Sequence, residues 1–237
     1  MSEDNTTQGP LTLAIDIGGS GLKMLVLDAS GEPVTERTRV PTPRPALPAP
    51  VLDALVSQFG DHGRFDRVSV GFPGVVVDGV TKNAPNLDPS WAGFDLAAAL
   101  TERAGRPTRV ANDADVQGFG AIEGRGVELV VTLGTGFGSA LFVDGRLVPN
   151  LEMGHHVFEK SRTYEEWLGQ AARDEGGKKR WNRRLERAIA SLRALFNFNT
   201  MYIGGGNAKK IGFDLPEDVR VVPNIAGILG GIRLWEA

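Results

Sequence analysis

The chain has 237 residues, of which 41% are hydrophobic and 23% charged, with a formal net charge of −3 and no cysteine. This is the composition of a globular protein with one large or two modest domains, and it gives no support to nucleic-acid binding through overall positive charge. The lack of cysteine excludes disulfides, cysteine zinc sites, iron–sulfur clusters and a thiol nucleophile. The N-terminus is polar and no apolar run approaches the roughly 18 residues of a membrane helix, so we expect a cytoplasmic protein without membrane partners.

The first half of the chain predicts strands followed by alternating helices and strands. Apolar, β-rich runs at 11–17 and 22–28 flank Gly18-Gly19-Ser20-Gly21, and a third run at 34–40 follows a turn. These three strands are expected to form an antiparallel meander. The proline-rich segment 41–50 is expected to be a stiff connector. The later elements predicted in this half are a helix at 51–59, a strand at 67–72, a helix at 96–103 and a strand at 108–111.

The second half repeats this order. Strands are predicted at 128–133 and 139–143 around a glycine turn at 134–138, and Asp144-Gly145 leads into a third strand at 146–148. Each half therefore begins with a strand, a glycine turn and a strand, which predicts a structural duplication. The remaining predicted elements are a helical region at 164–196 broken at Gly176-Gly177, strands at 201–203 and 219–222, and a helix at 225–235. The mixture of strands and helices predicts an α/β fold.

Glycine is unusually common, at 31 residues, and three glycine clusters directly follow predicted strands. Glycine allows backbone N–H groups to approach an anion without an intervening side chain. One such cluster is typical of an ordinary hairpin turn, whereas three of them after strands favour phosphate binding. None fits the P-loop or the dinucleotide fingerprint, so those two classes of nucleotide-binding protein are not supported.

The arrangement resembles the actin-like ATPase and sugar-kinase superfamily, in which hairpins from two similar domains hold a polyphosphate chain. Residues 16–23 are similar to its first phosphate motif, 133–140 to its second, and 204–207 to the glycine turn beside the nucleotide. The resemblance implies Gly18, Gly19, Ser20, Lys23, Gly134, Thr135, Gly136, Gly204, Gly205 and Gly206 as phosphate- or nucleotide-binding residues, together with Asp16. It leaves open whether Lys23 faces the phosphates or solvent.

Within that superfamily, Glu152-Met153-Gly154-His155 is similar to the Glu-x-Gly-His signature of the ROK family of sugar kinases and repressors. Asn112-Asp113-Ala114-Asp115 resembles that family's catalytic segment, while Gly71-Phe72-Pro73-Gly74 and residues 83–91 resemble its sugar-site loops. These motifs stand in the family order from residue 16 to residue 206. The absence of cysteine removes the zinc motif of many ROK proteins and is similar to the polyphosphate-dependent glucokinase branch.

The resemblance implies a fold of two actin-like, ribonuclease H-like domains with mixed sheets around a central cleft. The smaller domain would comprise 11–111 with a C-terminal helix at 225–237, and the larger 112–224. The implied activity is transfer of the terminal phosphoryl group of polyphosphate or ATP to the 6-hydroxyl of glucose or a related hexose, with Mg²⁺ and without zinc. A non-catalytic sugar sensor is the alternative. A homodimer is expected, and the hexose and the donor stay open.

For the chemistry, Asp113 is the predicted base that accepts the proton of the sugar hydroxyl. The other interpretation of Asn112-Asp113 is a cap for the helix that begins at Ala114. Asp16, at the end of a strand, is predicted to hold the metal directly or through water. The residues predicted to bind the sugar are Gly74, Asn86, Asn112, Asp113, Glu152 and His155. A further sugar-binding glutamate after His155 cannot be assigned from the sequence.

A basic segment stands out in this acidic chain. Residues 173–193 contain eight arginines and lysines but three acidic residues. The simpler interpretation is the solvated face of a helix. The other is a track for a long polyanion such as polyphosphate, which a single nucleotide would not need.

Overall fold

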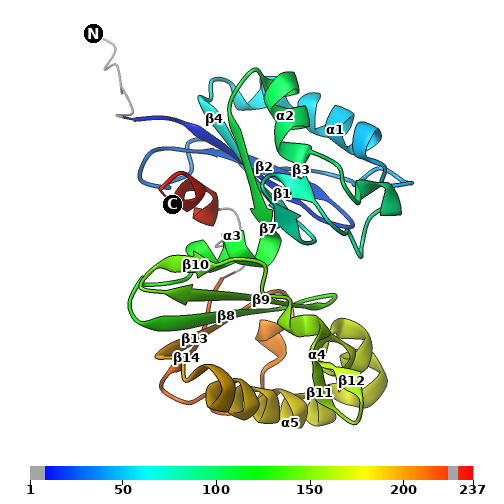
Figure 1. The fold of residues 1–237 in the computed structure, drawn as a ribbon, viewed down its shortest axis with the longest axis vertical. Helices are drawn as coiled ribbons and strands as arrows, with labels where there is room; N and C mark the ends of the chain where they lie inside the picture. The colour runs from blue at the N-terminus through cyan, green and yellow to red at the C-terminus, as the bar shows by residue number, and fades with distance from the viewer. Residues whose placement is uncertain (1–8, 224–228, 237) are drawn as a thin grey trace. The chain divides into compact units, whose positions relative to one another are not determined.

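The structure, a computed structural model, describes residues 9–223 and 229–236 (Figure 1). The described chain forms two compact units, one reaching to Val116 and including 229–236, the other running from Gln117 to residue 223. Each unit contains a five-stranded sheet with both parallel and antiparallel pairs, together with helices. The predicted α/β class with mixed sheets is confirmed.

The first sheet has the order β3-β2-β1-β4-β7. Strands β1 (Thr12–Ile17), β2 (Leu22–Leu27) and β3 (Thr38–Val40) form the antiparallel meander, and β4 (Arg67–Phe72) and β7 (Thr108–Asn112) continue the sheet in parallel with β1. Parallel strands end at the same edge of a sheet, so the loops that follow β1, β4 and β7 are gathered there.

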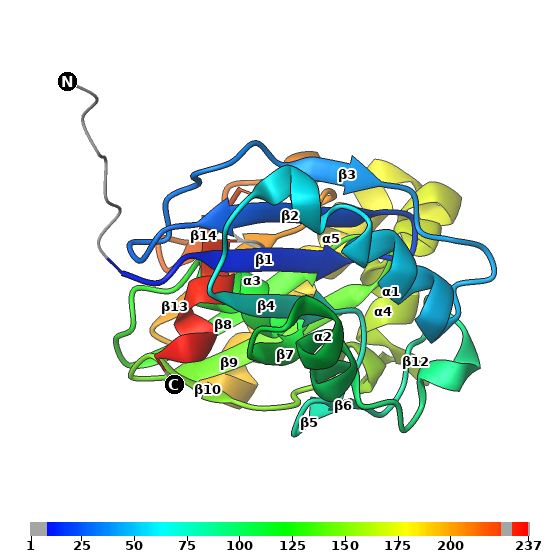
Figure 2. The same cartoon turned by 90° about the horizontal axis from the view of Figure 1, so that it is seen from above.

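Alternation along β1 separates the two faces of this sheet. Leu13, Ile15 and Ile17 pack into the core cluster that also contains residues of the helices α1 (Pro48–Val56) and α2 (Leu96–Ala104). The short 3₁₀ helix η1 (Phe59–His62) follows α1 in the chain, and η2 (Pro89–Trp91) precedes α2. Ala14 points to the other face, where it packs with Ile232 of the C-terminal turn. Figures 1 and 2 show α1 and α2 on the side of the sheet away from that turn.

Two local predictions for the first unit were wrong in extent, and one small element was missed. The proline connector is shorter than 41–50, because α1 begins at Pro48, and proline at the first helical position loses no intrahelical hydrogen bond. The third strand covers only Thr38–Val40, preceded by an isolated bridge between Leu27 and Pro33. A small hairpin of β5 (Val76–Val77) and β6 (Val80–Thr81) was not predicted.

The second sheet has the order β10-β9-β8-β13-β14, which repeats the topology of the first. Its strands are β8 (Val127–Leu133), β9 (Phe137–Val143), β10 (Arg146–Val148), β13 (Thr200–Gly204) and β14 (Val219–Val221). The first three are antiparallel, and β13 and β14 run parallel to β8. The carboxyl ends of β8 and β13 therefore bring the second and third glycine clusters to one edge.

One face of the second sheet is covered by the long helix α5 (Gln170–Phe196), whose buried residues include Trp181, Leu185 and Leu192. The helix is broken at Gly177, where φ is 72° and ψ is 159°, as the two adjacent glycines predicted. A small hairpin of β11 (Val157–Glu159) and β12 (Arg162–Thr163) and the short helix α4 (Tyr164–Leu168) precede it. The other short elements are α3 (Asp113–Phe119), η3 (Met153–His155) and η4 (Ala208–Lys210).

The C-terminal segment returns to the first unit as the 3₁₀ helix η5 (Gly230–Trp235). The Ser69 hydroxyl donates to the carbonyl of Gly231 at 2.6 Å and accepts from the Trp235 indole at 2.8 Å. The beginning of the helix predicted from residue 225 lies outside the described residues. None of the helices in the described part of the chain is long and apolar enough to cross a membrane.

Candidate functional site

In the first unit, the residues predicted to act on substrate follow the ends of three neighbouring parallel strands. The first glycine loop (residues 18–21) follows β1, Gly74 follows β4, and Asn112 ends β7. Cross-strand pairs of Asp16 with Gly71 and of Phe72 with Asn112 place these strand ends side by side. The structure therefore brings these residues to one edge of the sheet.

The first glycine loop turns its carbonyl groups toward the protein. It is closed by a 3.0 Å hydrogen bond from Gly18 N–H to the carbonyl of Gly21, and the carbonyl of Gly18 accepts from the Thr42 hydroxyl at 2.6 Å. The carbonyl of Gly19 accepts from the Arg44 guanidinium. Within residues 9–223 and 229–236, the N–H groups of Gly19 and Ser20 have no acceptor. Two consecutive donors are thus available to an anion.

These glycines are required for space rather than for backbone conformation, because none has a positive φ. A Cβ added to Gly18 would lie 2.9 Å from the carbonyl oxygen of Gly21. A Cβ added to Gly19 would lie 3.2 Å from the Cβ of Asn86. The second contact places Asn86, a predicted sugar-binding residue, directly against the first glycine loop.

Asp16 and Lys23 face each other across the β1–β2 hairpin. The Lys23 ammonium lies 2.6 Å from the Asp16 carboxylate, with both side chains partly exposed. Lys23 is therefore an ion-pair partner of Asp16, a role that the sequence, which left open phosphates or solvent, did not indicate. The pair holds the Asp16 carboxylate in place beside the first glycine loop.

Asn112 makes the local contacts at the start of α3. Its side-chain oxygen accepts from the N–H of Ala114 at 2.8 Å, and its side-chain nitrogen donates to the carbonyl of Gly74 at 3.1 Å. Asn112 thus makes the turn contact that the capping interpretation assigned to the Asn112-Asp113 pair. Asp113 is exposed at the first position of α3, whereas Asp115 is buried, with 4% exposure.

The second glycine loop (residues 134–136), in the other unit, has the same design. The N–H of Gly134 donates to the carbonyl of Gly136 at 3.1 Å, and the carbonyl of Gly134 accepts from the Asn207 side chain at 2.9 Å. The N–H of Gln170 donates to the carbonyls of both Gly134 and Thr135. In the part of the chain that the structure describes, the N–H groups of Thr135 and Gly136 have no acceptor.

The third glycine loop (residues 204–206) is fastened to the end of β8. Gly205 has a φ of 85°, and an added Cβ would lie 2.3 Å from the carbonyl oxygen of Leu133. The N–H of Asn207 donates to the same carbonyl at 2.9 Å, and its side chain accepts from Arg173. Asn207 therefore links the second and third glycine loops, and Arg173 of α5 positions Asn207.

The Glu-x-Gly-His segment rests on the beginning of β9. The buried Ser139 hydroxyl donates to the carbonyl of Leu151 at 2.9 Å and accepts from the N–H of Met153 at 3.1 Å. A Cβ added to Gly154 would lie 2.2 Å from the carbonyl oxygen of Phe137. The glycine of this motif is thus needed for close packing, which places Glu152 and His155 beside the second glycine loop.

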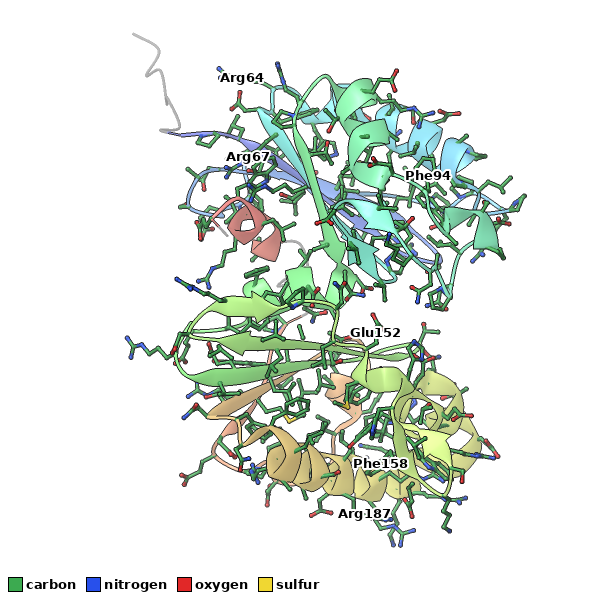
Figure 3. All side chains as sticks on the ribbon, viewed as in Figure 1. Arg64, Arg67, Phe94, Glu152, Phe158 and Arg187 are labelled. Atoms are coloured by element: carbon green, nitrogen blue, oxygen red, sulfur yellow. The ribbon has the colours of Figure 1, made fainter. Side chains whose placement is uncertain are left out.

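Glu152 of the second unit, labelled in Figure 3, has a partly exposed side chain. Burial raises its pKa above that of an ordinary glutamate, and the charge of Glu165 adds to this effect. His155, whose Nε2 lies 3.6 Å from the Glu152 carboxylate, acts in the opposite direction.

Glu165 is a candidate that the sequence pattern did not identify. Its carboxylate accepts from the N–H of Phe137 at 3.2 Å, and a Cβ on Gly136 would lie 2.1 Å from its Oε2. The capping box of Thr163 and Glu166 marks the start of α4 in the sequence and so places Glu165 in the first turn. The contact with Gly136 arises from packing between distant segments and leaves no local pattern.

Comparisons with known proteins show what the chain as a whole is similar to. Residues 12–168 match the model of the ROK family. The polyphosphate glucokinase of Mycobacterium tuberculosis is 30% identical to the chain, covering 96% of it and 94% of the relative. The crystal structure of inorganic polyphosphate/ATP-glucomannokinase from Arthrobacter sp. strain KM has a TM-score of 0.84 and 35% identity, covering 95% of this chain and 97% of that chain. A ROK family glucokinase from Streptomyces griseus, in complex with glucose and AMPPNP, has a similar fold, with a TM-score of 0.78, 20% identity, and coverage of 94% and 98%.

Proposed function

We propose that this chain, which belongs to the ROK family, is a sugar kinase that transfers the terminal phosphoryl group of polyphosphate or ATP to the 6-hydroxyl of glucose or a related hexose. The observation that carries the proposal is the repeated design of the first and second glycine loops. Each loop binds its carbonyl groups to the protein and leaves two consecutive N–H donors for an anion. Each loop can therefore hold a phosphate group of the donor.

In this proposal the exposed Asp113 accepts the proton of the attacking hydroxyl. A well-positioned base of this kind raises the reaction rate about 10²–10⁴-fold. Asn86, Asn112 and the backbone at Gly74 hold the hexose in the first unit. The second unit offers Glu152, Glu165 and His155 as further candidates for binding sugar hydroxyls, because a carboxylate accepts from two hydroxyls and a histidine can donate to one. Positioning and electrostatics supply the rest of the rate.

The residues present also fit a magnesium ion carried with the donor. Mg²⁺ keeps several waters and is usually held by one or two carboxylates and the substrate phosphates, so it needs no larger cluster of protein ligands. Asp16, beside the first glycine loop, would provide that carboxylate. When bound, the ion would neutralise negative charge on the phosphates during transfer. A homodimer in the cytoplasm stays a prediction.

The test is a matrix of donors and hexoses. ATP, tripolyphosphate and long-chain polyphosphate are each incubated with glucose, mannose and N-acetylmannosamine, and the sugar phosphates formed are measured. We expect glucose 6-phosphate with at least one donor. If the protein binds a hexose in calorimetry but forms no sugar phosphate with any donor, the sugar-sensor alternative replaces the kinase.

The raised pKa of Glu152 predicts how hexose binding depends on pH. The ionised carboxylate accepts from sugar hydroxyls, and protonation turns one of its oxygens into a donor. Because the pKa of Glu152 is raised, hexose KM should begin to increase at a higher pH than the value of about 4.3 for an ordinary glutamate would give. KM is measured from pH 8 to pH 5 or lower in the parent and in Glu152→Gln. The variant should have a higher KM that no longer changes over this acidic limb, and a parent profile parallel to that of the variant would contradict the prediction.

A further inference from the structure

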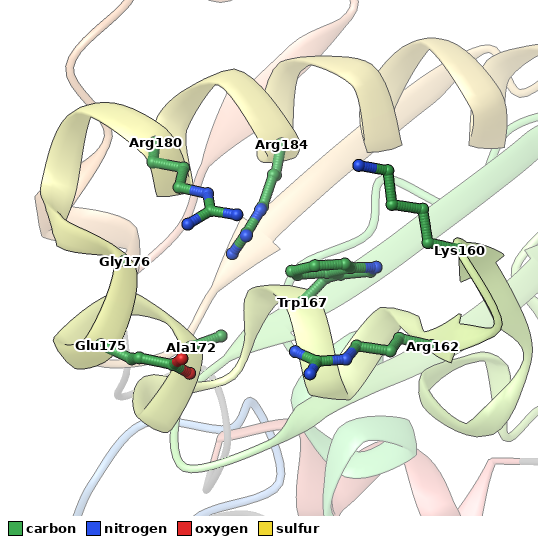
Figure 4. A pocket seen from close by; sticks show the side chains of 8 residues that line it. All are labelled: Lys160, Arg162, Trp167, Ala172, Glu175, Gly176, Arg180 and Arg184. Atoms are coloured by element: carbon green, nitrogen blue, oxygen red, sulfur yellow. The ribbon is translucent and has the colours of Figure 1, made fainter.

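A basic pocket lies where helix α5 breaks, apart from the glycine loops. Its volume is about 290 Å³, and it is lined by Lys160, Arg162, Arg180 and Arg184 around Trp167, with Glu175 at its side (Figure 4). An adjoining cavity adds Arg183 and an ion pair in which the Arg187 guanidinium lies 3.0 Å from the Glu159 carboxylate. The break at Gly177 creates this concave surface, because it allows the second part of α5 to place its arginines opposite the first part and the β11–β12 hairpin.

Among the basic residues that line the pocket, Arg184 is the one whose buried charge an anion would stabilise most. The residue is only 8% exposed, and within the described residues its guanidinium has no hydrogen bond or ion pair. It lies 3.8 Å from the centre of the Trp167 ring. Burial and the nearby Arg180 lower its pKa, while the carboxylates of Glu159 and Glu175 act in the opposite direction. A negatively charged ligand in the pocket would remove this unfavourable arrangement.

The aromatic ring in the pocket is not available to stack on a base. Arg184 covers one face of Trp167, and Arg162 lies 4.9 Å from the ring centre on the opposite face (Figure 4). Proteins that hold single-stranded nucleic acids rely on open aromatic faces for the bases. A pocket with cations on both faces of its tryptophan fits an anion that carries no bases.

The pocket is also close to the second glycine loop along α5. The N–H of Gln170, the first residue of α5, donates to the carbonyls of Gly134 and Thr135, and Gly176 lines the pocket. Six residues of helix correspond to about 9 Å. A chain of phosphates held at the second glycine loop therefore has a short path to the pocket.

Only part of the basic segment 173–193 lines the pocket. Arg173 binds Asp174 and Asn207, and Arg193 binds Asp218, so neither is part of the pocket. The pocket instead gains Lys160 and Arg162 from the β11–β12 hairpin. The turn of that hairpin holds Lys160 and Ser161 at φ values of 50° and 59°, which are unfavourable for residues other than glycine, asparagine and aspartate.

We propose that this pocket binds inorganic phosphate groups in the distal part of a long polyphosphate chain, while the end of the chain occupies the glycine loops. The proposal rests on the proposed function, in which polyphosphate is a donor. The cations of the pocket pair with successive phosphates, and Arg184 supplies a buried guanidinium for one of them. ATP and tripolyphosphate, held at the glycine loops, leave the pocket empty.

The test uses the double variant Arg180→Glu/Arg183→Glu, because Arg180 and Arg183 are exposed and make no hydrogen bond or ion pair with the described residues. KM is measured for ATP, tripolyphosphate and long-chain polyphosphate. KM for the long chain should rise about tenfold or more, since contacts between charged groups are lost, while the other two should change by less than about twofold. Higher salt should weaken use of the long chain in the parent more than in the variant.

The matched control is Arg125→Glu/Arg146→Glu, which changes the net charge equally at exposed positions of the same unit that do not line the pocket. It should leave all three KM values within about twofold. The proposal would be overturned if the two double variants raised KM for long-chain polyphosphate equally. It would also be overturned if the pocket variant raised KM equally for all three donors.

A binding measurement separates this proposal from the proposed function. Anisotropy of end-labelled long-chain polyphosphate is followed without hexose in the parent and in both double variants. If no donor yields a sugar phosphate, the proposed function fails, but weaker binding by the pocket variant alone would still support the pocket. If single-stranded RNA of equal charge displaces the labelled chain as effectively as unlabelled polyphosphate does, a general polyanion surface replaces the proposal.

Discussion

Asp113→Asn should lower kcat for glucose phosphorylation by about 100-fold or more and leave hexose KM within a few-fold of the parent. The amide keeps the size of the carboxylate and can still form hydrogen bonds with the sugar, but it cannot accept the proton of the attacking hydroxyl. Asn112 already makes the turn contact at the start of α3, so the substitution should not unfold this helix. Steady-state kinetics with the best donor and a thermal unfolding curve measure both effects.

The control for this substitution is Asp78→Asn. Asp78 is an exposed aspartate of the same unit with a φ of 53°, a conformation that asparagine adopts readily. The kcat of the Asp78→Asn variant should equal that of the parent. A kcat near the parent value in Asp113→Asn would remove Asp113 from the role of base. A large rise in hexose KM with little change in kcat would make it a binding residue instead.

The second large effect is expected from Gly205→Ala, which should destabilise the second unit by roughly 2–5 kcal/mol. The new Cβ would lie 2.3 Å from the carbonyl oxygen of Leu133 and 2.6 Å from its nitrogen, at a φ of 85°. The end of β8 and the third glycine loop would have to separate, which also disturbs the hydrogen bond from Asn207 to Leu133. Guanidinium unfolding followed by tryptophan fluorescence measures the loss of stability.

Gly206→Ala provides the comparison within the same loop. Gly206 has no atom within 4 Å of an added Cβ and no positive φ. The free energy of unfolding of the Gly206→Ala variant should therefore differ from that of the parent by less than about 0.5 kcal/mol. A rise in the KM for ATP in this stable variant would indicate that the loop approaches the nucleotide. Equal destabilisation by the two substitutions would contradict the steric account of Gly205.

The order of strands could be predicted from the sequence because each strand is a compact apolar run bounded by glycine or a turn. The break in α5 could also be predicted, since two glycines interrupt a helical pattern. The β5–β6 hairpin has an Asp-Gly turn at 78–79 that is typical of hairpins, whereas the β11–β12 hairpin has no such signal. The β11–β12 turn uses Lys160 and Ser161 in place of the asparagine and glycine that mark such turns. The start of α1 was hidden because prolines in a first helical turn look the same as prolines in a connector.

The same distinction between local patterns and distant contacts applies to the candidate site. Motifs at strand ends could be found because their residues are neighbours in the sequence. Contacts between distant segments could not, and these include Asn86 against Gly19, Glu165 against Gly136 and the Asn207 link to Gly134. The basic pocket is another case, because its cations come from a hairpin and from two sides of a helix break. Helical spacing alone does not indicate which arginines meet.

The packing of Gly154 on the carbonyl of Phe137 has a thermodynamic consequence. The segment expected to hold the hexose and the loop expected to hold the donor share this contact, and Ser139 and Glu165 join them further. A shift of either segment alters the other, so the two substrates are linked ligands. Linkage requires the synergy to be mutual, with hexose increasing donor affinity by the same factor as donor increases hexose affinity.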